Sequence, residues 1–104
     1  MNDRLYNAIG LCMKAGKASS GAYSVEKAIR SGKARLVFLE NTASDSTKDR
    51  YISMCSYYNV PIFMTDSVGE AIGKPERIVM AVTDDAFYRM MDGLIAQNSM
   101  IGGK

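Results

Sequence analysis

Two short, uninterrupted apolar runs constrain the fold of this chain more than any other feature. They are Leu36–Leu39 and Ile78–Val82, and polar residues surround both. A strand made only of large apolar side chains has no face suited to water, so both faces of its sheet must be covered. The segments between the runs show the apolar spacing of helices. The sequence therefore predicts an α/β fold: a three-layer α/β/α sandwich with a small mixed sheet of about four strands.

The remaining elements follow from apolar spacing and from capping residues. The pattern predicts helices over about 5–15, 21–31, 45–58 and 67–73, a final helix capped by Asp84, and a further strand at 62–64. Residues 17–20 are interpreted as a short link between the first two helices. The inward faces are predicted to carry Leu5, Ala8, Ile9, Cys12 and Met13; Val25, Ala28 and Ile29; Tyr51, Ile52, Cys55 and Tyr58; and Phe87, Met90, Met91, Leu94 and Ile95.

The length of 104 residues allows one compact domain. We expect that domain to span residues 1–97, followed by a loose tail at 98–104 that has no periodic pattern. No apolar run is long enough to cross a membrane, and the start of the chain lacks the apolar stretch of a signal peptide. A cytoplasmic protein is therefore expected. Cys12 and Cys55 are far apart in sequence and are predicted to be buried free thiols.

Charge is distributed unevenly along the chain. Residues 1–35 carry seven cations and two anions, whereas residues 36–70 carry two cations and five anions. The basic third contains a helix that Gly21 opens, with Lys27 about one turn inside it. A helix N-terminus has free N–H groups and the positive end of the helix dipole, and both favour an anion such as phosphate. The segment therefore indicates nucleic acid more than catalysis.

Residues that commonly perform catalysis or bind metals are scarce. The chain has no histidine, which is the commonest general base and metal ligand, and its two cysteines stand alone. The adjacent pair Asp84 and Asp85 lies where a helix begins, so capping explains it better than paired-carboxylate chemistry does. The sequence predicts no enzyme, no catalytic residue, no metal site and no cofactor.

The order of several short motifs resembles a known family. These are Gly16-Lys17, Ser20-Gly21 followed by Val25, Lys27 and Ile29, the run from Gly32 to Val37, Asn59-Val-Pro61, Gly69 with Gly73-Lys74, and the ending Ala81 to Phe87. Together they resemble the kink-turn RNA-binding ribosomal-protein family of the L7Ae/L30e type, and the resemblance covers about residues 4–95. The ending and the overall length are most similar to its bacterial YlxQ-like members.

The resemblance implies RNA recognition without catalysis. The expected partner is a structured RNA, either a kink-turn or ribosomal RNA, bound by a monomer within a ribonucleoprotein. Two regions would touch the RNA: the first turn of the second helix, and a loop before the last strand. Carried onto this sequence, the RNA-binding residues are Lys17, Gly21, Ala22, Tyr23, Ser24 and Lys27 in the first region, and Lys74, Pro75, Glu76 and Arg77 in the second.

The chain departs from the family pattern in both regions, and the second loop, Lys74–Arg77, is more charged than the apolar loop typical of the tightest binders. Archaeal and eukaryotic members carry an Asn-Glu pair that reads guanine edges, and this chain has Tyr23 and Ser24 instead. Shape and phosphate contacts are therefore expected to contribute more of the affinity than base contacts do. An alternative interpretation is a protein-interaction module on the same fold, because a fold does not determine function. Its contact surface would be the acidic segment with Glu40, Asp45 and Asp49.

Overall fold

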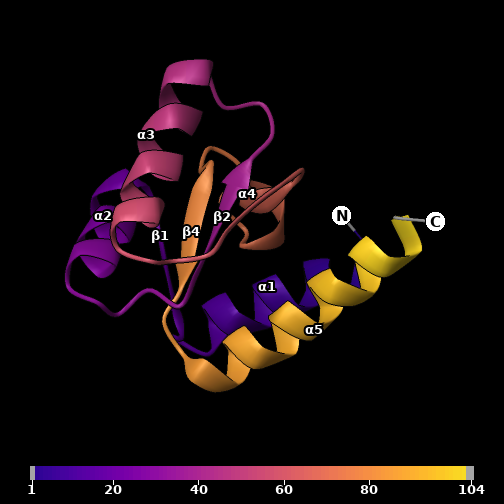
Figure 1. The fold of residues 1–104 in the computed structure, drawn as a ribbon. Helices are drawn as coiled ribbons and strands as arrows, with labels where there is room; N and C mark the ends of the chain where they lie inside the picture. Colours follow the sequence, from indigo (N-terminus) through magenta and orange to yellow (C-terminus); the bar gives the residue numbers. More distant parts are fainter. Residues whose placement is uncertain (1, 103–104) are drawn as a thin grey trace.

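A four-stranded sheet lies between two layers of helices (Figure 1). The computed structural model describes the backbone of residues 2–102. The helices are α1 (Asp3–Lys14), α2 (Ala22–Arg30), α3 (Asp45–Tyr57), α4 (Val68–Ala71) and α5 (Asp85–Gly102). The strands are β1 (Ala18–Ser20), β2 (Leu36–Glu40), β3 (Ile62–Thr65) and β4 (Val79–Val82).

The two apolar runs form the middle of the sheet, whose strand order is β1-β4-β2-β3. Strand β2 pairs antiparallel with β4, where Val37 lies opposite Ala81, and parallel with β3, where Val37 lies opposite Ile62. The central position explains why these runs carry apolar residues on both faces. The prediction of a mixed sheet of four strands is confirmed.

Successive side chains of β2 enter two separate hydrophobic clusters. Leu36 and Phe38 pack with residues of α1, α4 and α5, whereas Val37 and Leu39 pack with residues of α2 and α3. Figure 1 shows α2 and α3 on one side of the sheet and α1 and α5 on the other. A strand directs alternate residues to opposite faces, so each apolar run supplies both cores. The prediction of an α/β/α sandwich is confirmed.

The interpretation of residues 17–20 as a link is wrong, because Ala18–Ser20 form the edge strand β1. Ala18 lies opposite Val82 and Ser20 opposite Met80 in an antiparallel ladder with β4. Backbone pairing holds this short strand, and its small, half-buried residues show no apolar alternation. No apolar pattern in the sequence marks this strand, so it could not be predicted from apolar spacing.

Four residues predicted to face the core are instead substantially exposed. They are Ile52 (40%), Tyr58 (39%), Ile78 (38%) and Met90 (44%). On α3 only Tyr51 and Cys55 are buried, so the face that meets the sheet is narrower than the apolar pattern indicated. Ile78 precedes β4 and lies in the loop before it.

Helix α4 is not capped by the side chain of its N-cap residue, Ser67, although Ser67 and Glu70 have capping-box spacing. Ser67 adopts a left-handed conformation (φ 60°) and makes no side-chain capping bond. The carboxylate of Glu40, at the end of β2, accepts hydrogen bonds from the backbone N–H groups of Ser67 (3.0 Å) and Val68 (2.9 Å). Negative charge at a helix N-terminus is favourable. Glu40 is therefore engaged within the fold and is a poor member of the protein-contact surface that the alternative interpretation required.

The start of α5 agrees with the prediction from the sequence. The Asp84 carboxylate accepts a hydrogen bond from the backbone N–H of Phe87 at 3.0 Å, as expected of an N-cap. The backbone of α5 is helical to Gly102, and the loose tail from residue 98 stays a prediction. Residues 103–104 lie outside the described part of the chain.

Both cysteines are buried free thiols, as predicted. Cys12 belongs to the cluster beneath α1 and α5, and Cys55 to the cluster beneath α2 and α3. Burial raises the pKa of each thiol from 9.0 to about 11, and the negative charge of Asp84 adds to this effect at Cys12. The thiols therefore stay protonated, and unreactive, at neutral pH.

Raising the pH above 9 should destabilise the protein. Between the unfolded and folded pKa values the unfolded chain releases thiol protons that the folded chain retains, so stability falls with pH. At pH 10 each thiol should lower the free energy of unfolding by about 1.4 kcal/mol relative to pH 7. Urea unfolding at the two pH values measures this difference. In a Cys12→Ala/Cys55→Ala variant, most of this decrease in the free energy of unfolding should disappear. If the decrease is unchanged in that variant, groups other than the thiols cause it.

Candidate nucleic-acid interface

The first turn of α2 is exposed and free of acidic side chains. Gly21 occupies the N-cap position with φ 85° and ψ 156°, and it offers no side chain to cap the helix. Ala22, Tyr23, Ser24 and, one turn on, Lys27 are all exposed, and Tyr23 has 79% of its surface accessible. The first N–H groups of a helix lack intrahelical partners. This turn therefore presents backbone donors, a positive dipole end, a cation and an aromatic ring to solvent.

The second predicted region, Lys74–Arg77, is a tight loop between α4 and β4. It folds directly over Gly69, where an added Cβ would lie only 2.6–2.8 Å from three backbone carbonyl oxygens of the loop. The N–H of Lys74 donates to the Gly69 carbonyl at 2.9 Å, and the N–H of Arg77 donates to the Lys74 carbonyl at 2.9 Å. Lys74, Pro75 and Glu76 are exposed. Their positions are thus set by the packing of the loop backbone on α4.

Arg77 connects the two regions. Its Nη1 donates to the backbone carbonyl of Ser20 at 2.9 Å and is 3.1 Å from the Ser20 hydroxyl, while its Nε lies 3.4 Å from the Glu76 carboxylate. The guanidinium lies so close to Gly21 that any Cβ there would collide with Nη1. Gly21 therefore leaves room for an arginine of the same chain.

Lys17 lies away from this junction. Its carbonyl accepts from the N–H of Thr83 at one end of the β1–β4 ladder, whereas Gly21 donates to the Val79 carbonyl at the other end. Lys17 and Gly21 are four steps apart along extended chain, a span of roughly 13 Å. Arg77 brings the loop Lys74–Arg77 against Gly21 at the start of α2, whereas Lys17 lies at the other end of β1.

Two hollows flank the first turn of α2. One, of about 230 Å³, lies between α2, α3 and the loop before β4; it is lined by Gly21, Ala22, Thr47, Arg50, Tyr51, Glu76, Arg77, Ile78 and Val79. The other, of about 440 Å³, runs along α2 and is lined by Tyr23, Glu26, Lys27, Arg30 and Ser31. Four cations, Lys27, Arg30, Arg50 and Arg77, and two carboxylates, Glu26 and Glu76, line these hollows.

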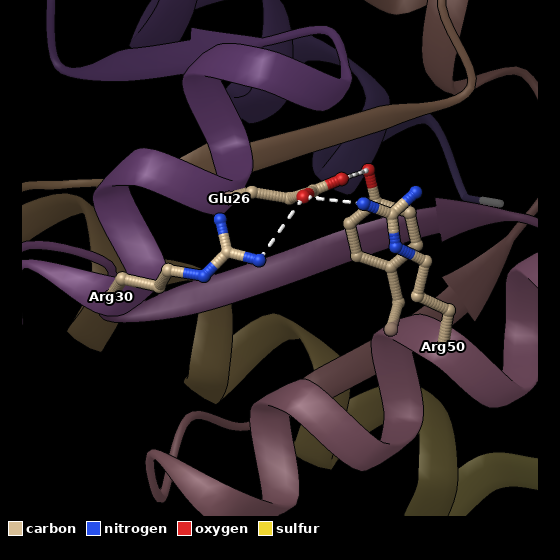
Figure 2. A network of polar contacts seen from close by, with 4 residues as sticks. Glu26, Arg30 and Arg50 are labelled. Carbon is tan, nitrogen blue, oxygen red and sulfur yellow. Dashed lines mark hydrogen bonds and ion pairs between the residues drawn. The ribbon is translucent and has the colours of Figure 1, made fainter.

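A buried carboxylate, that of Glu26, lines the larger hollow, and two of its partners, Arg50 and Tyr51, line the smaller one. Figure 2 shows the contacts of Glu26 with Arg30 and Arg50. Glu26, only 7% exposed, accepts hydrogen bonds through Oε1 from Arg50 (2.6 Å) and Arg30 (3.4 Å). Its Oε2 accepts from the hydroxyl of Tyr51 at 3.2 Å. Burial and the neighbouring Glu26 charge raise the pKa of Tyr51 to about 12, so its hydroxyl remains a donor. The guanidiniums approach from different helices, Arg30 from α2 and Arg50 from α3.

Sequence reasoning did not find this network. The spacing of Glu26 and Arg30, four residues apart on one helix, was a usable signal for an ion pair. Nothing local links Glu26 to Arg50, which is 24 residues further along the chain.

The described residues contain no group of three or more His, Cys, Asp or Glu side chains that could hold a metal ion. No helix in the described part of the chain is both long and apolar enough to span a membrane.

Comparison with known proteins places the chain in a family. The model of the ribosomal protein L7Ae/L30e/S12e/Gadd45 family matches residues 3–90. The chain is 39% identical over 90 residues to RNA-binding protein YlxQ of Bacillus subtilis (strain 168), which covers 84% of this chain and 90% of that protein. It is 38% identical over 92 residues to RNA-binding protein YlxQ of Enterococcus faecium, covering 86% and 88% of the two chains.

A solved structure shows the same architecture. A protein of unknown function from Bacillus halodurans C superimposes with a TM-score of 0.85 at 32% sequence identity, over 91% of this chain and 99% of that one. The resemblance inferred from the ordered motifs is confirmed by these matches. The chain belongs to the ribosomal protein L7Ae/L30e/S12e/Gadd45 family.

Proposed function

We propose that this protein binds structured RNA without catalysis, through the surface formed by the first turn of α2 and the loop Lys74–Arg77. The observation that carries the proposal is the Arg77 bridge. It holds two segments more than fifty residues apart in sequence against one another at Gly21. Relatives named RNA-binding protein YlxQ, similar over most of their length, support the same function.

The chemistry of this surface suits an RNA backbone. Uncapped N–H groups of α2 and the exposed ammonium groups of Lys27 and Lys74 favour phosphate oxygens. The exposed ring of Tyr23 can stack on an unpaired base. Ser24 has one hydroxyl where a carboxylate would accept several hydrogen bonds from guanine. Phosphate and shape contacts would therefore dominate the affinity.

A kink-turn, in ribosomal RNA or a similar ribonucleoprotein, is the target class that we propose. Gel-shift titration against a kink-turn RNA and against a mutant without its sheared G·A pairs tests this directly. We expect tighter binding to the intact kink-turn. With about four phosphate contacts, affinity should fall by roughly two orders of magnitude between 50 and 200 mM salt. Equal binding of both RNAs would contradict kink-turn recognition, and binding of neither would contradict the function itself.

Substitution of Lys27 locates the surface. Lys27→Ala should weaken binding to both RNAs and lower the slope of log affinity against log salt by about one. Lys33→Ala is the matched control, because it removes the same charge beyond the opposite end of α2. If the two variants bind alike, the proposed surface is misplaced.

A further inference from the structure

Arg30 and Arg50 carry more hydrogen-bonding capacity than the fold uses. Among the described residues, Glu26 is the partner of both guanidiniums, through a single contact to each. A guanidinium has five N–H donors. The side chains are 54% and 58% exposed, so most of these donors face solvent. One carboxylate beside two guanidiniums leaves one positive charge on this surface.

These two arginines also extend along the proposed RNA surface. Arg50 lines the hollow shared by Gly21, Ala22 and Arg77, and Arg30 lines the hollow shared by Tyr23 and Lys27. Neither arginine belongs to the motifs that predicted the surface. Together they widen the positive area from the first turn of α2 across to α3.

Glu26 restricts where the Arg50 guanidinium can go. Arg50 contacts it at 2.6 Å, and the Tyr51 hydroxyl fixes the other carboxylate oxygen at 3.2 Å. An arginine normally loses considerable side-chain freedom when it binds a ligand, and a side chain that is already ordered loses less. The planar guanidinium matches the geometry of phosphate oxygens. A fixed and mostly exposed guanidinium is therefore well suited to a phosphate.

We infer that Arg50, with Arg30 beside it, forms a phosphate-binding site for the RNA backbone, and that Glu26 is its positioning residue. The inference rests on the RNA-binding function proposed above and adds α3 as a third part of the interface. The alternative is that the ion pair with Glu26 serves stability alone. In that case, replacing Arg50 would leave RNA affinity unchanged.

Arg50→Gln in the full chain tests the site against the kink-turn RNA and its mutant. Loss of one phosphate contact should lower the salt slope by about 0.9 and weaken binding about eightfold at 0.1 M salt. Lys48→Gln is the matched control: the charge change and the helix are the same, but a two-residue step on a helix points the side chain to another face. Lys48→Gln should change RNA affinity less than twofold.

The Glu26→Gln variant distinguishes a role of Glu26 in positioning Arg50 from an effect of the negative charge of Glu26 alone. If Glu26 only repelled RNA, removing its charge would tighten binding. If it positions Arg50, binding should weaken, by less than in Arg50→Gln, while the amide keeps a hydrogen bond to Tyr51. Urea unfolding of each variant checks that it is folded at the binding temperature. A tighter Glu26→Gln complex overturns the positioning role.

The outcomes distinguish this inference from the function on which it rests. If the unmodified protein prefers the kink-turn but Arg50→Gln and Lys48→Gln have the same affinity and the same salt slope, the Arg50 site alone is overturned. Failure of the unmodified protein to bind either RNA overturns both. A selective loss in Arg50→Gln supports the site.

Discussion

Replacing Gly21 with alanine should lower the free energy of unfolding by about 1–3 kcal/mol and should also weaken RNA binding. Gly21 has φ 85° and ψ 156°, a backbone region that residues with a Cβ rarely occupy. The new methyl group would also collide with Nη1 of Arg77. Arg77 would have to leave Ser20, and the loop before β4 would lose its attachment to the start of α2.

Two further variants separate the contribution of backbone strain from that of the collision with Arg77. Gly32→Ala also places alanine at a positive φ, 78°, but its Cβ would enter open space. Its stability loss should be smaller than that of Gly21→Ala, and its RNA affinity should be unchanged. Adding Arg77→Ala to Gly21→Ala removes the collision, so the double variant should be more stable than the sum of the single changes predicts. Equal behaviour of Gly21→Ala and Gly32→Ala would show that the Arg77 contact is unimportant.

Replacing Gly69 with alanine should have an effect of similar size for a different reason. Its Cβ would meet the carbonyl oxygens of Arg77 (2.6 Å), Lys74 (2.7 Å) and Pro75 (2.8 Å). These are backbone atoms of a tight loop, so they cannot rotate away as a side chain could. Overpacking of this kind costs about 1–3 kcal/mol. The loop Lys74–Arg77 should shift, and RNA affinity should fall while the first turn of α2 remains intact.

Gly93 provides the matched control for Gly69. It lies within α5, and a Cβ there would meet nothing within 4 Å. Gly93→Ala should therefore stabilise the protein by about 0.5–1 kcal/mol, because alanine favours the helix. Urea unfolding and gel-shift titration of both variants provide the comparison. Unchanged RNA affinity in Gly69→Ala would show that the loop does not contact RNA.

The sequence predicted the sandwich and most of its elements because local spacing reports burial. Four consecutive apolar residues at Leu36–Leu39 required a covered strand, and β2 lies in the middle of the sheet. The same reasoning failed at Ala18–Ser20, where pairing to β4 through the backbone creates a strand without an apolar pattern. It also placed Ile52 in the core, because apolar character alone does not show how wide a buried face is.

The candidate site was predicted in outline and not in its connections. Motif order pointed to the first turn of α2 and the loop Lys74–Arg77 as the candidate site. It could not show that Arg77 reaches Ser20, 57 residues away, or that Lys17 lies at the far end of β1. Polar contacts over such distances have no periodic signature, because they depend on which segments the sheet order brings together.

By itself the sequence determined the layers of this protein, its buried strands and thiols, and the family to which its motifs belong. Those properties follow from the order of apolar and polar residues, which decides what can be exposed to water. Only the tertiary structure decided that Glu40 caps α4, that Gly21 makes room for Arg77, and that Glu26 holds two arginines from different helices. Directional contacts between charged and polar groups require particular atoms to meet, and folding determines which atoms meet.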